Sequence, residues 1–188
     1  MDGQTIRALE FDGDFRRDVL AHEAARDISA CFDCKTCTVG CPLHTVNPEH
    51  DPRKIARMVN LGMRERVLSS PLIWYCSNCG LCEKHCPQKV RFFSALDVLK
   101  EMAVKAGYPA PVSISEDICC GCGICIGLCP YTAIELRTHD VKKVAHLNPT
   151  SCRGCGVCNA ACPSGAISMN HFQDEQVFAQ LVALGSSP

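Results

Sequence analysis

Apolar residues recur with helical periodicity through most of the first 108 residues. Asp51 followed by Pro52 is typical of the start of a helix, and Gly62 is typical of its end. The pattern therefore predicts an all-helical first half whose apolar stripes serve core packing. Helices are expected over residues 15–28 after a candidate Asp14 cap, from Pro52 to the stop at Gly62, over 63–68 and from Phe92 to a stop at Gly107. The stripes are Ile55, Met58 and Val59 in one helix and Phe92, Leu96, Leu99, Ala103 and Ala106 in another.

Beyond residue 108 the periodicity changes to short strand-like runs. "AIEL" (133–136) and "KKVAHL" (142–147) flank a polar turn at residues 138–141, and "GAISM" (165–169) echoes "TAIEL" (132–136). The echo indicates an internal pseudo-twofold repeat in a compact α+β unit. The prolines of "YPAPVS" (108–113) predict an extended linker before it. A last helix, Asp174 to Leu184, is expected to carry Val177, Phe178, Leu181 and Leu184 on one face.

The predicted fold class is mixed, with two domains of different type. Residues 1–108 form a helical domain, residues 109–170 an α+β domain, and residues 171–188 a C-terminal helix and tail.

Composition adds a constraint that the hydrophobic pattern lacks, because 17 of the 188 residues are cysteines. That content indicates a fold held together by disulfides, zinc or iron–sulfur clusters. The N-terminal segment has no continuous apolar stretch of the signal-peptide kind, and no run approaches the length of a membrane helix. We therefore expect a cytoplasmic protein, in which disulfides are rare and metal is favoured. The net charge of −1, without a basic block, gives nucleic-acid binding little electrostatic support.

Four segments share the spacing C-x2-C-x2-C-x3-C-P, and 16 of the 17 cysteines fall in this register. We call them runs one to four. They read "CFDCKTCTVGCP" (31–42), "CSNCGLCEKHCP" (76–87), "CCGCGICIGLCP" (119–130) and "CRGCGVCNAACP" (152–163). Three closely spaced cysteines can bind three irons of a cubane [4Fe-4S] cluster from one loop. In two-cluster proteins, the fourth cysteine of each run binds the other cluster.

This crosswise rule predicts four [4Fe-4S] clusters. Cluster one takes Cys31, Cys34, Cys37 and Cys86, and cluster two takes Cys76, Cys79, Cys82 and Cys41. Cluster three takes Cys119, Cys122, Cys125 and Cys162, and cluster four takes Cys152, Cys155, Cys158 and Cys129. Zinc is the alternative, but all-cysteine zinc sites use two separated C-x2-C pairs. A disulfide framework fits less well still.

The remaining residues of the runs have simpler interpretations. Glycines between the ligands permit positive φ where the backbone passes close to sulfide, and they are Gly80, Gly121, Gly123, Gly154 and Gly156. Cys120 is the extra cysteine, and we interpret it as a small buried residue or free thiol; an alternative ligand or redox-active thiol remains open. The glycines of run three do not match G-x-G-x-x-G, because Ile126 occupies the third position. No flavin or nicotinamide fingerprint is present, so we expect neither cofactor in this chain.

These motifs carry a resemblance to a known family. Residues 10–108 resemble the C subunit of heterodisulfide reductase through "CFDCKTCTVGCP", "DPRKIARMVNLGM", "IWYCSNCGLCEKHCPQKV" and the closing "AVKAGY". The same helical two-cluster design (an alpha-helical ferredoxin) resembles, more distantly, the iron–sulfur subunits of succinate, glycerol-3-phosphate and glycolate dehydrogenases. The second half resembles a bacterial-type two-cluster ferredoxin. Its "CRGCGVCNAACPSGAISMNHFQDEQVFAQLVAL" is similar to the C-terminal ferredoxin segment of the flavin-bearing A subunit of the same heterodisulfide reductase.

The resemblance implies an electron-transfer subunit without an active site of its own. It would relay electrons between a flavoprotein similar to the A subunit and a catalytic protein similar to the B subunit. The assembly would be a hetero-oligomeric, anaerobic complex of the kind that includes electron-bifurcating ones. One alternative is a free polyferredoxin carrier, although a mobile carrier usually has a strongly acidic surface and this chain has a net charge of −1. The other alternative is an iron–sulfur subunit of a quinone-linked dehydrogenase.

Overall fold

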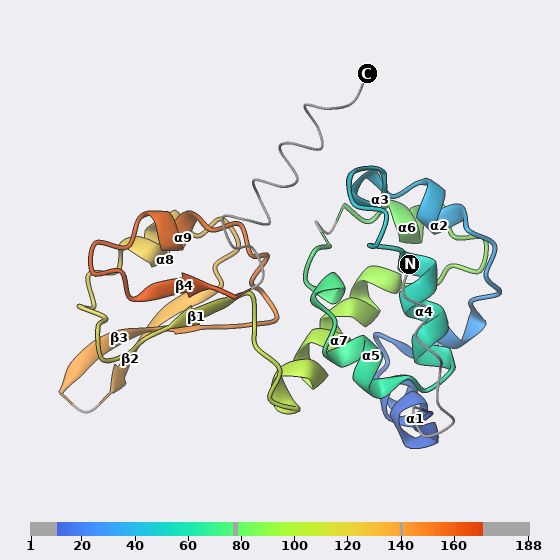
Figure 1. Cartoon of the computed structure of the whole chain (residues 1–188), viewed down its shortest axis with the longest axis horizontal. Coiled ribbons are helices and arrows are strands. Elements are labelled where there is room, and N and C mark those ends of the chain that lie inside the picture. Colours follow the sequence, from blue (N-terminus) through green and yellow to red (C-terminus); the bar gives the residue numbers. More distant parts are fainter. Residues whose placement is uncertain (1–10, 77–78, 140, 171–188) are drawn as a thin grey trace. The chain divides into compact units, whose positions relative to one another are not determined.

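The computed structural model describes residues 11–76, 79–139 and 141–170. The chain divides into two compact units, residues 1–108 and 109–188 (Figure 1). Every element described up to residue 108 is helical, whereas the described elements beyond it include all four strands and two short helices. The mixed fold class is therefore confirmed. The helix expected over residues 174–184 lies outside the described residues.

The first unit is built from short helices, of which α7, with 14 residues, is the longest and α1 and α4 have nine each. The bounds are α1 (Gly13–Ala21), η2 (Arg26–Ala30), α2 (Thr36–Val39), α3 (Pro42–Val46), α4 (Pro52–Asn60), α5 (Arg64–Leu68), η3 (Pro71–Ile73), α6 (Leu81–Lys84) and α7 (Phe92–Lys105). The largest fully buried side chains of this unit include Trp74, Phe15, Ile55 and Leu96. They give it an ordinary hydrophobic core.

The single helix expected over residues 15–28 is wrong, because the chain forms α1 and then the 3₁₀ turn η2. Asp12 is the cap, not Asp14, and its Oδ1 accepts the amide N–H groups of Asp14 and Phe15 at 2.9 and 3.1 Å. On one continuous helix, Ile28 would lie on the face opposite Phe15. The break after Ala21 lets both side chains reach the core, where Phe15 and Ile28 are 0 % and 1 % exposed.

Helix α4 begins as its sequence predicts. Asp51 is the N-cap and accepts the amide N–H of Lys54 at 3.1 Å, and Pro52 occupies the first turn. Gly62 stops the helix with φ +72°, and a Cβ there would lie 2.4 Å from the carbonyl oxygen of Asp12. Glycine is therefore required both by the left-handed conformation and by the close approach of the α1 cap.

The α7 stripe is confirmed over most of its length. Phe92, Leu96, Leu99 and Ala103 are all buried, whereas Ala106 is exposed at the C-cap and so does not belong to the stripe. Lys100 of the same helix is 0 % exposed and its Nζ lies 3.4 Å from Asp97 Oδ1. The apolar pattern gave no sign of this buried charge.

The second unit places α8 (Ile124–Leu128) and α9 (Val157–Ala160) together on one side of its strands (Figure 1). Strands β2 (Ile134–His139) and β3 (Lys142–Leu147) form the predicted hairpin. Strand β4 (Ile167–Met169) pairs with β1 (Val112–Ile114) in the register Val112 with Met169. The predicted linker is therefore wrong at its end, because residues 112–114 join a sheet whose other strand lies more than 50 residues along the chain.

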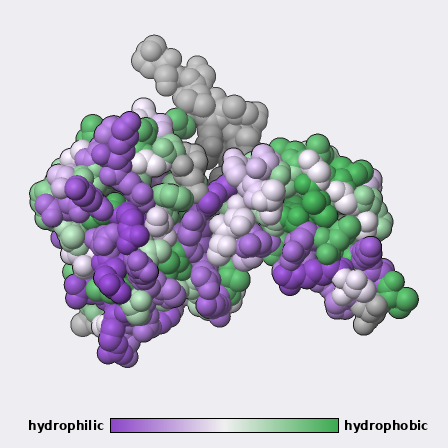
Figure 2. Space-filling model, turned by 180° about the vertical axis from the view of Figure 1, so that it is seen from behind, coloured by the Kyte–Doolittle hydropathy of each residue, from purple (hydrophilic) through white to green (hydrophobic). Residues whose placement is uncertain are grey.

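The core of the second unit is small and rich in sulfur. Its buried members are Val112, Cys125, Ala133, Ile134, Ala145, Cys152, Cys158 and Ile167. Figure 2 shows hydrophobic surface gathered on this unit, whereas polar side chains cover most of the visible face of the first. Exposed apolar side chains of α8 and α9 include Ile124, Leu128 and Val157.

Within the described ranges, none of the helices combines the length and hydropathy needed to cross a bilayer.

Candidate iron–sulfur sites

The four runs share one local backbone. In each, the residue after the second cysteine has a left-handed conformation and caps a one-turn helix that carries the third cysteine. These caps are Lys35 of α2, Gly80 of α6, Gly123 of α8 and Gly156 of α9, with φ of 67°, 71°, 76° and 76°. Gly121 and Gly154 are left-handed as well, with φ of 69° and 66°. The expectation of positive φ at the glycines between the ligands is confirmed.

The first cavity collects the cysteines assigned to cluster one. It has a volume of about 430 Å³ and is lined by Cys31, Cys34 and Cys37 of run one together with Cys86 of run two. The N-terminal turn of α4 forms part of its wall through Pro52 and Arg53. Cys82 of run two lines it too, so the cavity brings the first three cysteines of run one together with the third and fourth cysteines of run two.

A second cavity of about 330 Å³ collects the cluster two set, and its sulfur-bearing residues are Cys41, Cys76, Cys79 and Cys82. His50 and Phe92 also line it. Cys82 lines both this cavity and the first, so the two lie next to each other.

The third cavity, of about 320 Å³, lies in the second unit and collects Cys119, Cys122, Cys125 and Cys162. Cys120 lines it too, so five thiols surround one space. Because Cys120 is exposed, the expectation that it is a buried residue is wrong. It lines the cavity together with the two predicted ligands Cys119 and Cys122.

The cluster four set lies in the core of the same unit. Cys152 and Cys158 are buried in it, and Cys129 packs against it. Cys155 is exposed. Burial raises the pKa of Cys158, and the negative charges of Cys152 and Cys155 raise it further. For all four sets, the role as iron ligands stays a prediction.

In runs two and three, the fourth cysteine is followed by a tight turn that returns an amide to its sulfur. Val90 donates its N–H to Cys86 Sγ at 3.4 Å, and Ala133 donates to Cys129 Sγ at 3.3 Å. Lys89 and Thr132, just before these donors, have positive φ of 55° and 48°. In these two runs, the Pro after the cysteine thus begins a turn whose amide stabilises negative charge on sulfur.

The exposure of a cysteine depends on its position in the run. The second cysteine is exposed in every run, and these are Cys34, Cys79, Cys122 and Cys155. The third cysteine is buried in runs two to four, as Cys82, Cys125 and Cys158. For clusters two to four, one side of the predicted cluster therefore lies near the surface while the opposite side lies in the protein interior.

The buried thiols resist ionisation unless a cation is present. Burial, with a smaller contribution from neighbouring cysteines, raises the pKa of Cys37 and Cys158 to about 11 and that of Cys82 to about 12. Among the described residues, no group of Cys, His, Asp and Glu side chains converges as tightly as a single metal ion requires. The thiols instead surround shared spaces in sets of four or five, and this donor set fits an iron–sulfur cluster.

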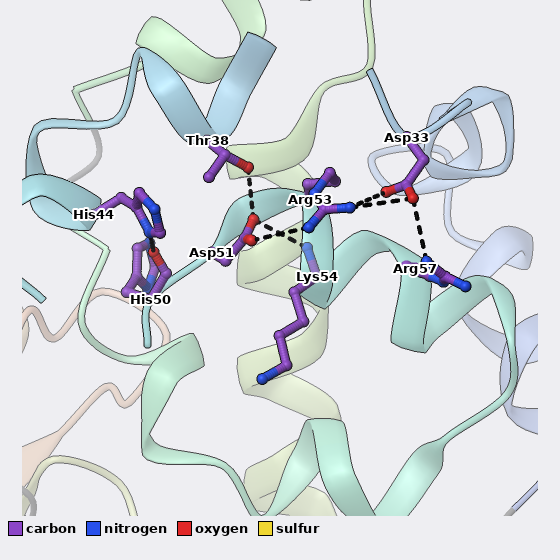
Figure 3. A network of polar contacts seen from close by, with 8 residues as sticks. All are labelled: Asp33, Thr38, His44, His50, Asp51, Arg53, Lys54 and Arg57. Atoms are coloured by element: carbon purple, nitrogen blue, oxygen red, sulfur yellow. Dashed lines mark hydrogen bonds and ion pairs between the residues drawn. The ribbon is translucent and has the colours of Figure 1, made fainter. Parts of the chain in front are cut away.

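A polar network lies beside the first cavity and connects run one to α4 (Figure 3). Thr38, next to Cys37, donates its hydroxyl to Asp51 Oδ1 at 2.6 Å. Arg53 donates to both carboxylate oxygens of Asp33 at 3.1 and 3.2 Å and to Asp51 Oδ2 at 3.5 Å. Arg57 donates to Asp33 Oδ2 at 3.3 Å. The N-cap of α4 and the loop of run one are thus held by the same side chains.

Burial tends to raise the pKa of Asp51, but hydrogen bonds from Thr38 and the Lys54 amide outweigh it, so the net shift is downward. The carboxylate is therefore held ionised. Sequence reasoning identified Asp51 only as a helix cap and missed Arg53 and Thr38 as parts of the site. The cysteine spacing carries no signal for them, since they act through contacts across 13 to 20 residues.

Comparison with known proteins agrees with this chemistry. Residues 27–90 and residues 118–166 each match a family described as a 4Fe-4S dicluster domain. Over 106 residues, 56 % of each chain, the protein is 33 % identical to the C subunit of the H(2):CoB-CoM heterodisulfide,ferredoxin reductase of Methanothermobacter thermautotrophicus. Over 89 residues, 47 % of each chain, it is 36 % identical to the iron-sulfur subunit numbered C 2 of the CoB--CoM heterodisulfide reductase of Methanocaldococcus jannaschii.

A third relative is the iron-sulfur subunit numbered A 2 of the CoB--CoM heterodisulfide reductase of Methanopyrus kandleri, 47 % identical over 108 residues. That match covers 54 % of this chain and 16 % of the relative. The chain spans about half the length of the C-subunit relatives that it matches. It carries two 4Fe-4S dicluster domains and is related in sequence to the iron–sulfur subunits of heterodisulfide reductases.

Proposed function

We propose that this chain is an electron-transfer subunit that holds four [4Fe-4S] clusters and has no active site of its own. The observation that carries the proposal is the composition of the cavities. In each of the three, three cysteines of one run meet the fourth cysteine of its partner run. A single chain that holds such cysteine sets in both of its units is suited to pass electrons through several clusters in succession.

When bound, each cubane takes up and releases one electron. The residues of the chain fix the positions of the clusters, keep water away and supply hydrogen bonds to sulfur. Burial of the third cysteine in runs two to four provides the dry side of those sites, and the amides of Val90 and Ala133 provide donors. Exposure of the second cysteine leaves a short path to a docked partner.

The relatives suggest the setting of this relay. We infer a hetero-oligomeric heterodisulfide reductase-like complex, in which the chain connects a flavoprotein similar to the A subunit with a catalytic protein similar to the B subunit. Similarity to C and A subunits of heterodisulfide reductases supports this placement. The exposed apolar side chains Ile124, Leu128 and Val157 on the second unit are suited to a protein partner rather than to a freely diffusing carrier.

The proposal is tested on anaerobically purified full-length protein. We expect about sixteen irons and as many acid-labile sulfides per chain, four of each for every cubane, and a spin signal after dithionite reduction. Native purification from the source cells is expected to recover a complex that contains a flavoprotein. A chain with far less iron, or one that turns over a substrate alone, would contradict the proposal.

A further inference from the structure

Arg53 is the cationic residue of α4 that lines the cavity of predicted cluster one. Its two terminal nitrogens bind the carboxylates of Asp33 and Asp51, as Figure 3 shows. The third nitrogen, Nε, is buried and has no hydrogen-bond partner among the described residues. A buried guanidinium N–H without an acceptor is unfavourable, so such a donor indicates a missing acceptor.

Asp33 provides an independent observation. It lies between the first two cysteines of run one and has a φ of 68°. The equivalent residues of runs three and four, Gly121 and Gly154, have φ of 69° and 66°. Run one therefore places a carboxylate where the other two use glycine. Asp adopts this conformation more readily than most residues, and here its carboxylate holds Arg53.

The network around Arg53 is rigid and close to neutral. Two carboxylates, Asp33 and Asp51, offset the two guanidinium groups of Arg53 and Arg57. Thr38 fixes Asp51 from the side of run one. Because the charges balance, the network acts on the cavity through the direction of its N–H groups more than through net charge.

We propose that the Nε–H of Arg53 donates a hydrogen bond to a sulfur of cluster one and raises the reduction potential of that cluster. The acceptor is a bridging sulfide or a cysteine thiolate in the cavity formed by Cys31, Cys34, Cys37 and Cys86. Hydrogen bonds to cluster sulfurs stabilise the more negative, reduced state. This inference rests on the proposed function, because it requires cluster one to be present.

The first experiment uses the unaltered full-length protein. Arginine carrying ¹⁵N at Nε is incorporated, the protein is reduced with dithionite, and pulsed electron paramagnetic resonance measures coupling between ¹⁵N and the reduced clusters. We expect one arginine Nε to couple to one cluster. A Cys34→Ser variant identifies the signal of cluster one, because the substitution changes a ligand of that cluster alone. Absence of any arginine coupling to that signal would overturn the inference.

The second experiment compares two variants that remove the same charge from the same network. Arg57 pairs with Asp33 as Arg53 does, but its side chain is 63 % exposed and does not line the cavity. In a redox titration, Arg53→Met is expected to shift the cluster one midpoint to more negative potential, whereas Arg57→Met leaves it nearly unchanged. Equal shifts in both would show a pure charge effect and would exclude the hydrogen bond.

If Arg53→Met fails to fold, Arg53→Lys takes its place, since it keeps the charge and loses the Nε donor. The iron content tests the proposed function, and the arginine coupling tests the hydrogen bond from Arg53. Iron far below about sixteen atoms per chain, four for each cubane, overturns the proposed function. Four intact clusters with no arginine coupling overturn this inference alone.

Discussion

Gly121 lies where a side chain has no room. A Cβ at this position would be 2.3 Å from the carbonyl oxygen of Lys143 on β3, and the backbone has a φ of 69°. Gly127, six residues further along the same run, lies inside α8, and a Cβ there would meet no other described part of the chain within 4 Å. Gly121 thus permits a close approach of two backbone segments, whereas Gly127 is one residue of a helix with open space beside it.

Gly121→Ala is expected to displace the loop of run three and to lower the iron content toward about three quarters of the parent value, because one of four clusters is lost. Gly127→Ala is the matched control and is expected to keep the full iron content. Iron and sulfide analysis of anaerobically purified proteins measures both. An unchanged iron content in Gly121→Ala would show that the loop yields without affecting the site.

Cys120 and Cys122 line the same cavity, but only Cys122 is a predicted iron ligand. Cys120→Ser is expected to retain all the iron, because the spacing assigns no iron to Cys120. Cys122→Ser is expected to lose or destabilise cluster three, seen as reduced iron and an altered spin signal. Should Cys120→Ser lose iron to the same extent as Cys122→Ser, the ligand set predicted for cluster three is wrong.

Helix α4 contacts both the loop of run one and the hydrophobic core of the first unit. Its cap residue Asp51 binds both the helix backbone and Thr38 of run one, and Arg53 in its first turn reaches Asp33. Ile55 and Val59 bury the opposite face in the core. The helix therefore connects the hydrophobic core of the first unit to the wall of the first cavity.

Asp51→Ala is expected to lower the stability of the first unit by roughly 2 kcal/mol, since it removes the cap and leaves the buried Thr38 hydroxyl without its acceptor. Trp74 is the single tryptophan of the sequence and is 1 % exposed, so its fluorescence during urea unfolding reports on this unit. Asp14→Ala is the control, because its exposed pair with Arg17 contributes little. Equal urea midpoints for the two variants would contradict the role of Asp51.

At the scale of the whole molecule, the core that stabilises the first unit differs from the core of the second. The first buries large side chains such as Trp74, Phe15 and Leu96. The second has a core in which predicted cluster ligands, Cys125, Cys152 and Cys158, replace much of the hydrocarbon. A domain of about 60 residues is only marginally stable by packing, and we expect metal binding to contribute directly to its folding.

Removal of the clusters is therefore expected to affect the units unequally. After treatment with chelator and oxidant, amide hydrogen exchange followed by mass spectrometry is expected to show loss of protection over residues 109–170. Peptides of α4 and α7 in the first unit are expected to keep a larger share of theirs. Uniform loss of protection in both units would show that the clusters support the helical core equally.

Much of the fold follows from local pattern. The cap at Asp51, the stop at Gly62, the α7 stripe and the β2–β3 hairpin are confirmed, because each depends on residues close together in the chain. The break after α1 and the pairing of β1 with β4 were missed, since both are decided by distant contacts. The one-turn helices within the runs were also missed, because four residues carry too little periodicity to reveal a helix.

The predicted chemistry follows from the chain's local pattern, because iron ligation depends on thiol spacing within a loop and that spacing occurs four times. What surrounds those thiols depends on the tertiary structure. It brings Cys86 beside run one, aligns Arg53 between Asp33 and Asp51, and buries Lys100. These are contacts between residues far apart in the chain, and their free energies depend on burial and distance, which no local pattern encodes.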